Sequence, residues 1–282
     1  FGFQRIHDLA WAAGDSQAKG FLIGATSGRT TLNGEGLQHQ DGHSHLFSAT
    51  IPNCLSYDPA YAYELAVIFQ HGIQKMFVDL ENYYYYITVT NENYEQPAKP
   101  KGADEGIIKG MYRLIENKEH QVILIGSGSI LNESVKAIEI LSSVGITAEV
   151  WSVTSFNMLR KDGIDKQRFN ELNPDAISKL SYVEECLSDE SVPVIASTDY
   201  IRAYPEQIRS YIKAPFYTLG TDGYGRSDSR EKLREFFEID ANNIARMASY
   251  SLFKKGALTK TEINKIYKKL KVDSSKPNPW EV

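Results

Sequence analysis

The sequence predicts an α/β protein of two domains, each built on a parallel or mostly parallel sheet flanked by helices. The chain has 282 residues, a length typical of about two ordinary domains. Its hydrophobic fraction of 42% is high enough to form real cores. Strand-like and helical patterns alternate along the chain, which is the order expected of parallel sheets.

Composition excludes several classes of protein. The net charge of -5 argues against a general nucleic-acid partner or an anionic membrane, because both require a basic field. Cys54 and Cys186 lack C-x-x-C spacing, which predicts neither a disulfide framework nor a thiolate metal site and is typical of a reducing compartment. No run approaches about 18 apolar residues, so no membrane span is expected, and no signal peptide is expected either. The chain opens without Met and inside a helical pattern, so we expect it to be a piece of a longer protein.

The first 90 residues alternate between helices and strands. Phe3, Ile6, Leu9, Ala10 and Ala13 recur at helical spacing and predict one apolar helix face. Aromatic and β-branched residues in "YYYYITVT" predict a strand. The expected order is a helix from residue 1 to Gly14 or Gly20, a strand at 21–26, a polar loop at 27–48, a strand at 50–57, a helix at 59–77 and a strand at 83–90.

A polar stretch with two prolines follows and predicts a linker at 94–106. The first domain would then comprise residues 1–93 and the second residues 107–282. In the second domain, strands are expected at 121–129, 146–156, 192–198 and 216–222, with helices between and after them.

Three helices of the second domain have sequence signals of their own. One begins at about residue 130 and is stopped by Gly145. Asp228, followed three residues later by Glu231, resembles a capping box at the start of another. The basic stretch 260–271 has apolar residues at helical spacing, so it predicts a packed C-terminal helix with a solvated outer face.

The polar loop at 27–48 is the first candidate site, because it follows a strand end, where open α/β sheets bind ligands. Its segment "NGEGLQHQDGHSH" contains Glu35, His39, Asp41, His43 and His45. A His-x-x-x-His pair on a helix can bind zinc, although the intervening Gly favours a turn. Imidazole and carboxylate groups also suit an acid/base loop. A polar connection without chemistry is the third interpretation.

Three further motifs have competing interpretations. "IGSGSI" at 125–130 lies where dinucleotide-binding turns lie but lacks their third glycine, which favours tight packing of strand on helix. "GTDGYGRSD" at 220–228 is either a turn before a capped helix or an anion cradle. The tyrosines at 83–86 either alternate between two faces of a strand or form an aromatic platform. These patterns do not identify the reaction.

Longer motifs resemble a known family. "FGFQRIHDLAWAAGD", "GEGLQHQDGHSH", "YYYYITVTNENY", "LIGSGSIL", "VWSVTSFNML", "ASTDY" and "LGTDGYGRSDSRE" occur in the order found in the homodimeric bacterial pyruvate dehydrogenases (acetyl-transferring). These are the thiamine-diphosphate components of the pyruvate dehydrogenase complex. The resemblance covers essentially the whole chain, and so many motifs in one order are highly specific.

The resemblance implies a transketolase-like enzyme with three α/β domains. Residues 1–93 would be the latter part of the middle domain, which binds the aminopyrimidine ring, so the first domain would be incomplete. Residues 107–282 would be the C-terminal domain. The Gly-Asp-Gly…Asn motif that holds diphosphate and Mg²⁺ is expected upstream, and no metal ligand is expected within this chain.

The resemblance also implies the site residues. Glu35 and His39 match the catalytic pair in "GEGLQH", which lies at the substrate end of the cofactor and takes part in proton movements. His45 matches a catalytic histidine that recurs in related transketolases. Phe1 matches an aromatic residue that stacks on the aminopyrimidine. Gln40 departs from the acid found in relatives, and the resemblance assigns it no role.

The implied reaction is decarboxylation of pyruvate on thiamine diphosphate with Mg²⁺, followed by reductive acetylation of the lipoyl group of the dihydrolipoyl acetyltransferase. The implied protein is a bacterial, cytoplasmic homodimer without nucleic-acid or membrane partners. The separate chain is expected to be inactive. The alternatives are another thiamine-diphosphate enzyme (transketolase or another 2-oxo-acid dehydrogenase), a non-catalytic dimerisation or docking fragment, and a zinc hydrolase.

Overall fold

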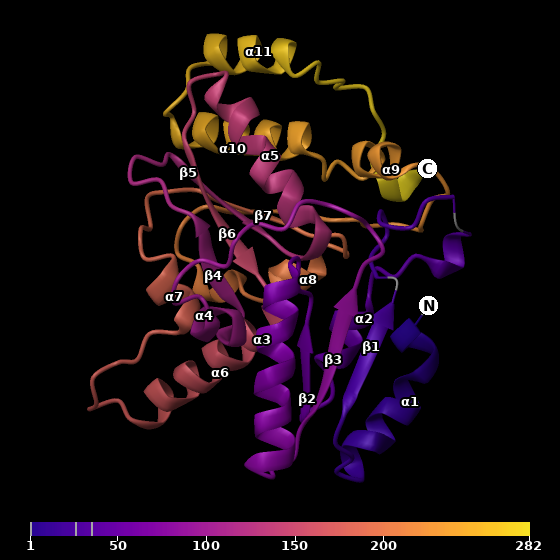
Figure 1. The fold of residues 1–282 in the computed structure, drawn as a ribbon. Coiled ribbons are helices and arrows are strands. Elements are labelled where there is room, and N and C mark those ends of the chain that lie inside the picture. The colour runs from indigo at the N-terminus through magenta and orange to yellow at the C-terminus, as the bar shows by residue number, and fades with distance from the viewer. Residues whose placement is uncertain (1, 26, 35) are drawn as a thin grey trace.

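The computed structural model describes residues 2–25, 27–34 and 36–282, apart from the side chain of Gln38. It confirms the predicted α/β class, with one sheet of three strands and one of five (Figure 1). In Figure 1 the smaller sheet lies at the bottom of the molecule and the larger one above it. The division into domains at residues 94–106 stays a prediction.

The smaller sheet is parallel, with strand order β1-β3-β2. Its central strand is the tyrosine-rich run of the sequence, and all three strands lie where the pattern predicts them. The strands are β1 (Phe21–Ala25), β2 (Cys54–Tyr57) and β3 (Tyr84–Val89). The helices of this part are α1 (Gly2–Asp15), α2 (Ser44–Ser48) and α3 (Ala62–Ile73), which continues as a π-helical turn over Gln74–Val78.

The tyrosines of β3 point alternately to the two faces of the sheet, as their spacing in a strand requires. The hydroxyl of Tyr84 donates to the carbonyl of Ala10 in α1 at 2.9 Å. On the opposite face, the hydroxyl of Tyr85 lies 3.0 Å from Nδ1 of His71 in α3. Tyr84, Tyr85 and Tyr86 are all buried, so helices cover both faces and these three rings form no open platform.

The first helix is confirmed, but its predicted apolar face is wrong for Ile6 and Leu9, which are exposed. Phe3, Ala10 and Gly14 are buried against the sheet, whereas Leu9 is 72% exposed. At about 100° per residue the three buried positions fall within roughly 20° of one line along the helix, and Leu9 lies about 120° away. The sheet therefore covers a narrower stripe of this helix than the apolar pattern predicts.

The larger sheet has strand order β4-β6-β5-β7-β8 and is parallel except for β4, which runs antiparallel to β6. The four parallel strands lie at the predicted positions. The fifth, β4, was not predicted; it follows α4 (Asp104–Lys109), which begins inside the predicted linker. The strands are β4 (Met111–Ile115), β5 (Val122–Gly126), β6 (Ala148–Val153), β7 (Val194–Ser197) and β8 (Phe216–Leu219).

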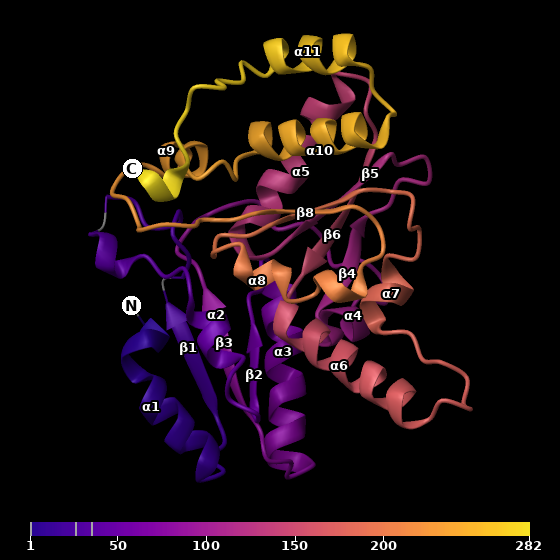
Figure 2. The same cartoon turned by 180° about the vertical axis from the view of Figure 1, so that it is seen from behind.

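Helices cover both faces of the larger sheet (Figures 1 and 2). Val122 and Leu124 of β5 pack into the core formed with α5 and α10, and Ile123 and Ile125 pack into the core on the other face. On the first face lie α5 (Leu131–Ser142) and α10 (Ala241–Lys255), and on the second α6 (Phe156–Leu172), α7 (Tyr182–Cys186) and α8 (Ala203–Glu206).

Two helices complete the C-terminal part. The helix α11 (Lys260–Lys269) buries Ile263 and Ile266, as its spacing predicts. The helix α9 (Arg230–Phe236) is capped by Ser229, whose side chain accepts from the backbone N–H of Lys232. The predicted cap, Asp228, is wrong by one residue, because its carboxylate instead accepts from the N–H of Ser229 at 2.7 Å.

The two cysteines are free, and Cys54 is buried in the core of the smaller sheet. Over the described part of the chain, no helix is both long and apolar enough to cross a membrane.

Candidate active site

The polar loop leaves the carboxyl end of β1 and crosses to the loops that follow the strands of the larger sheet (Figure 1). As predicted, it is long and mostly irregular. Its regular pieces are a 3₁₀ turn over Leu37–His39 and the short helix α2.

A cavity of about 560 Å³ opens where this loop leaves the sheet. One wall is apolar and comes from α1 and β1, and the other is polar and comes from the loop. Such a combination suits a ligand with a flat apolar part and a reacting polar part. The cavity is lined by Gly2, Phe3, Ile6, Leu22, Ile23, Gly24, Ala25, Ser27, Leu32, His39, Asp41 and Tyr86.

The predicted site residues fall into three groups. His39 is exposed in the 3₁₀ turn and lines the cavity. Glu35 and Phe1 lie outside the described residues. His45 is 1% exposed and is not among the residues that line the cavity. The catalytic roles of Glu35, His39 and His45 and the cofactor contact of Phe1 stay predictions.

His45 lies in a buried polar and aromatic cluster between the two sheets. Its ring stacks on Tyr204, with centroids 4.8 Å apart, and meets Tyr200 edge to face at 4.7 Å. The hydroxyl of Thr88 donates to Asp58 at 2.7 Å and lies 3.1 Å from Nε2 of His45. Both tyrosines follow β7, so His45 joins the first part of the chain to the second.

Burial shifts the two titratable groups of this cluster in opposite directions. It lowers the pKa of His45 to about 3 and raises the pKa of Asp58 to about 7. The His45 contribution to stability is therefore lost as the pH falls below the ordinary value of 6.5 towards 3. The Asp58 contribution is lost as the pH rises from its ordinary value of 3.8 towards 7. Between about pH 4 and pH 6.5 the two groups therefore change the free energy of unfolding with pH in opposite directions, and their effects cancel.

Removing either group should leave the pH dependence that the other group gives to the free energy of unfolding. In His45→Phe, the free energy of unfolding relative to wild type should rise by about 1.4 kcal/mol for each unit of pH decrease from 6.5 to 4. In Asp58→Asn, the free energy of unfolding relative to wild type should fall by a similar amount over the same pH decrease, because only His45 then titrates. Denaturant unfolding at several pH values measures both slopes. Slopes of the same sign in the two variants would contradict the opposed titration of this pair.

The three histidines of the loop do not converge on one point. His43 pairs with Gln4 at 2.9 Å and with Arg29 at 3.4 Å, whereas His45 is buried against Tyr200 and Tyr204. Burial lowers the pKa of His43, and the nearby Arg29 lowers it further. Within the described residues, no group of three or more His, Cys, Asp or Glu side chains is placed to hold a metal ion.

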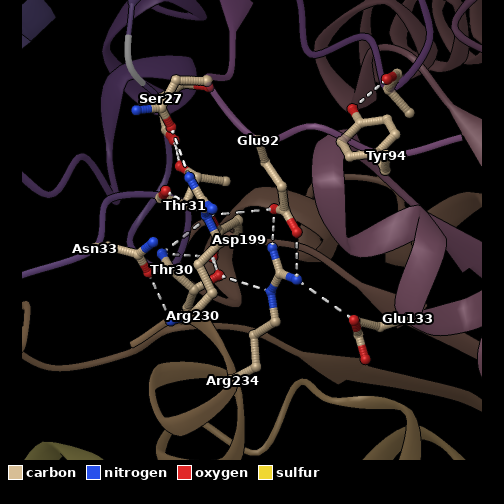
Figure 3. Close-up of polar contacts among 12 residues, drawn as sticks. Ser27, Thr30, Thr31, Asn33, Glu92, Tyr94, Glu133, Asp199, Arg230 and Arg234 are labelled. Atoms are coloured by element: carbon tan, nitrogen blue, oxygen red, sulfur yellow. Dashed lines mark hydrogen bonds and ion pairs between the residues drawn. The ribbon is translucent and has the colours of Figure 1, made fainter. Parts of the chain in front are cut away.

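The start of the loop is fixed by Asp199, which follows β7. Its carboxylate accepts from the N–H of Thr30 at 3.1 Å and from the hydroxyl of Thr30 at 2.7 Å (Figure 3). Gly28 has φ +81°, and a Cβ there would lie 2.0 Å from the Asp199 carboxylate. Burial raises the pKa of Asp199 to about 6, and the charge of Arg234 opposes that shift.

Two arginines of α9 extend this network (Figure 3). Arg230 donates through Nε to the carbonyl of Thr31 at 2.7 Å. Arg234 is 5% exposed and donates to Glu92, to Glu133 at 3.4 Å and to the hydroxyl of Thr30 at 3.3 Å. The buried guanidinium of Arg234 thus binds three parts of the chain: the polar loop, the segment that follows β3, and α5.

Sequence reasoning did not identify Asp199, Arg230 or Arg234 as partners of the loop. The available signal was the position of Asp199 two residues after a buried strand, at the sheet edge where sites gather. The "IGSGSI" motif, in contrast, fits its structural interpretation, because a Cβ on Gly126 would lie 2.7 Å from Cα of Leu131.

Comparison with known proteins finds the same family along the whole chain. Residues 1–97 match the family model described as "Pyruvate dehydrogenase E1 component middle domain". Residues 110–240 match "Transketolase-like TK C-terminal domain". The chain is 57% identical over 286 residues to the pyruvate dehydrogenase E1 component of Pseudomonas aeruginosa, covering all of this chain and 32% of that protein. It is 54% identical to the one from Escherichia coli K12, covering 99% of this chain and 32% of the relative.

Solved structures agree on the fold. A transketolase mutant from Pichia stipitis superposes with a TM-score of 0.68 at 18% identity, covering 90% of this chain and 33% of that one. The transketolase of Campylobacter jejuni gives a TM-score of 0.66 at 18% identity, covering 86% and 33%. The chain spans about a third of the length of the relatives that it matches. On this evidence, the chain belongs to the pyruvate dehydrogenase E1 component family.

Proposed function

We propose that the protein containing this chain is a pyruvate dehydrogenase (acetyl-transferring). It decarboxylates pyruvate and reductively acetylates the lipoyl group of the dihydrolipoyl acetyltransferase component. The observation that supports this most strongly is the position of His39, in a chain 57% identical to an E1 component, at the polar wall of the cavity beside β1.

The cofactor of this proposal is thiamine diphosphate with Mg²⁺. The cavity suits one end of it: Phe3, Ile6 and Ile23 offer apolar surface to a flat ring, and His39 offers a polar group beyond it. In this proposal the ligands of the diphosphate and of Mg²⁺ come from other sequence, as the resemblance to the family implies. When bound, the cofactor supplies the electron sink that decarboxylation of a 2-oxo acid requires.

The residues of this chain would then bind, orient and protonate. His39 would hydrogen-bond the oxygen of the substrate and move a proton at that atom, and Glu35 would hold a second hydrogen bond. The apolar wall would exclude water from the reacting carbon. Phe1 would stack on the aminopyrimidine, and residues 1–93 and 107–282 would form the middle and C-terminal domains.

The remaining parts of the proposal concern assembly and location. The protein would act as a homodimer in the bacterial cytoplasm, with pyruvate as substrate and the lipoyl domain as acceptor. Two free cysteines without a disulfide are typical of a reducing compartment.

A substrate panel tests the proposal. A full-length enzyme that includes these residues is assayed with thiamine diphosphate, Mg²⁺ and pyruvate, 2-oxoglutarate or a ketose phosphate. Acetyl transfer to a lipoyl domain from pyruvate, with little turnover of the other two, is expected. Turnover of 2-oxoglutarate or of the ketose phosphate in place of pyruvate would overturn the proposed substrate.

A further inference from the structure

The glycine-rich segment 220–228, which we call the glycine loop, lies against the turn that carries His39. Gly225 is buried, and a Cβ there would lie 2.5 Å from Oε1 of Gln40 and 2.9 Å from the carbonyl oxygen of Leu37. Leu37 is the first residue of the turn, and Gln40 follows its last residue, His39. A side chain at Gly225 would therefore force the turn, the glycine loop or both to shift, because backbone contacts this short are not tolerated.

Gln40 and Arg226 bind each other reciprocally across this contact. Nε2 of Gln40 donates to the carbonyl of Arg226, and the N–H of Arg226 donates to Oε1 of Gln40 at 2.7 Å. The Gln40 side chain is buried, and the backbone N–H of Gln40 closes the turn by donating to the carbonyl of Leu37 at 3.3 Å. An ionised carboxylate at this position could accept from Arg226 but could not donate to it.

The contact continues along the glycine loop. Arg29 donates to the carbonyls of Thr221 and Gly223, and the N–H of Gly34 donates to the carbonyl of Asp228 at 3.1 Å. The polar loop is thus bound near its start, at Gly34 and beside His39 by one segment that follows β8.

We propose that Gly225 and Gln40 are positioning residues, and that the glycine loop holds the His39 turn at the cavity in the geometry needed for turnover. This inference rests on the proposed function for its catalytic consequence. It also gives Gln40 a role in this chain: its amide makes a two-way bond that an acid at the same position could not make.

Gly225→Ala in the full-length enzyme tests the proposal. The kcat for pyruvate should fall roughly 10- to 100-fold, the scale expected when a catalytic group is displaced by about 1 Å. The KM for pyruvate should change much less. Gln40→Glu should lower kcat to a smaller extent, since it removes one of the two bonds.

A double-mutant cycle separates positioning from a general loss of structure. Because Gly225 acts through His39, Gly225→Ala combined with His39→Ala should be no slower than His39→Ala alone. Gly256→Ala is the matched control. Gly256 has φ +83° at the end of α10, with open space around it, so alanine there strains the same half of the chain without touching the turn. It should leave kcat unchanged.

Hydrogen exchange provides a measurement that does not depend on activity. The amides of His39 and Gln40 should exchange at least about tenfold faster in Gly225→Ala, which corresponds to a loss of local protection of about 1.4 kcal/mol. They should not do so in Gly256→Ala. Unchanged exchange in Gly225→Ala, or additive losses of kcat in the double mutant, would overturn the inference. Absence of pyruvate turnover in wild type would instead refute the proposed function, and the exchange result alone would then decide whether the glycine loop holds the turn.

Discussion

Replacing His39 with alanine in the full-length enzyme is expected to lower kcat for pyruvate by roughly 100-fold or more, the scale of a positioned acid/base group. His39 lines the polar wall of the cavity, beside the carboxyl end of β1. Its loss would remove the proton donor or acceptor beside the substrate oxygen without opening a hole in the core, because the side chain is exposed. Steady-state kinetics with pyruvate and a lipoyl acceptor measure the effect.

His120→Ala is the matched control for His39→Ala. His120 lies in the turn before β5 and contacts Asn117 and Glu149, away from the cavity residues. Its replacement should leave kcat and KM unchanged. Turnover at the wild-type rate in His39→Ala would remove His39 from the mechanism.

Replacing Arg234 with methionine is expected to lower the free energy of unfolding by about 3–5 kcal/mol. Arg234 is 5% exposed and forms ion pairs with Glu92 and Glu133. Methionine would remove the buried cation and leave only the outer partners, Arg230 at 3.9 Å from Glu92 and Lys136 at 2.8 Å from Glu133. Adding Glu92→Gln to the variant should restore part of the loss, because it removes one of the carboxylates that has lost its buried partner. Chemical denaturation measures each free energy.

Lys232 on the same helix supplies the control. Its ion pair with Glu235 is 64% and 60% exposed on the two sides, so Lys232→Met should leave the free energy of unfolding close to that of wild type. Equal losses for Arg234→Met and Lys232→Met would show that burial of the Arg234 network contributes nothing.

The alternation of helices and strands was predictable because burial gives strands and helices different spacings of apolar residues. β4 was not predicted: its five residues follow a six-residue helix directly, which leaves little pattern to detect. The exposure of Leu9 was also missed, since an apolar residue near the edge of a helix face looks the same in sequence whether or not a partner covers it.

The candidate site was predictable only in part, for a physical reason. A strand end and a polar loop indicate where chemistry occurs, and these pointed to the loop at 27–48. The choice of His39 within that loop came from the family resemblance. The groups that hold the loop lie far along the chain: Thr30 and Asp199 are 169 residues apart, and Gln40 and Arg226 are 186 apart. No regular spacing of residues predicts such pairs, because they form only when the loops of the two sheets come into contact. The sequence of the glycine loop therefore shows only glycines typical of a turn, whereas in the structure this loop contacts the turn that carries His39.

The most direct test of a substrate site at His39 is the rate at which its imidazole is modified by diethyl pyrocarbonate, mapped by mass spectrometry in the full-length enzyme. The rate is measured with and without thiamine diphosphate, Mg²⁺ and a phosphonate analogue of pyruvate that cannot be decarboxylated. We predict that the bound ligands slow modification of His39 and leave that of His120 unchanged. Equal rates at His39 in the free and the saturated enzyme would contradict the assignment of this cavity as the substrate end of the active site.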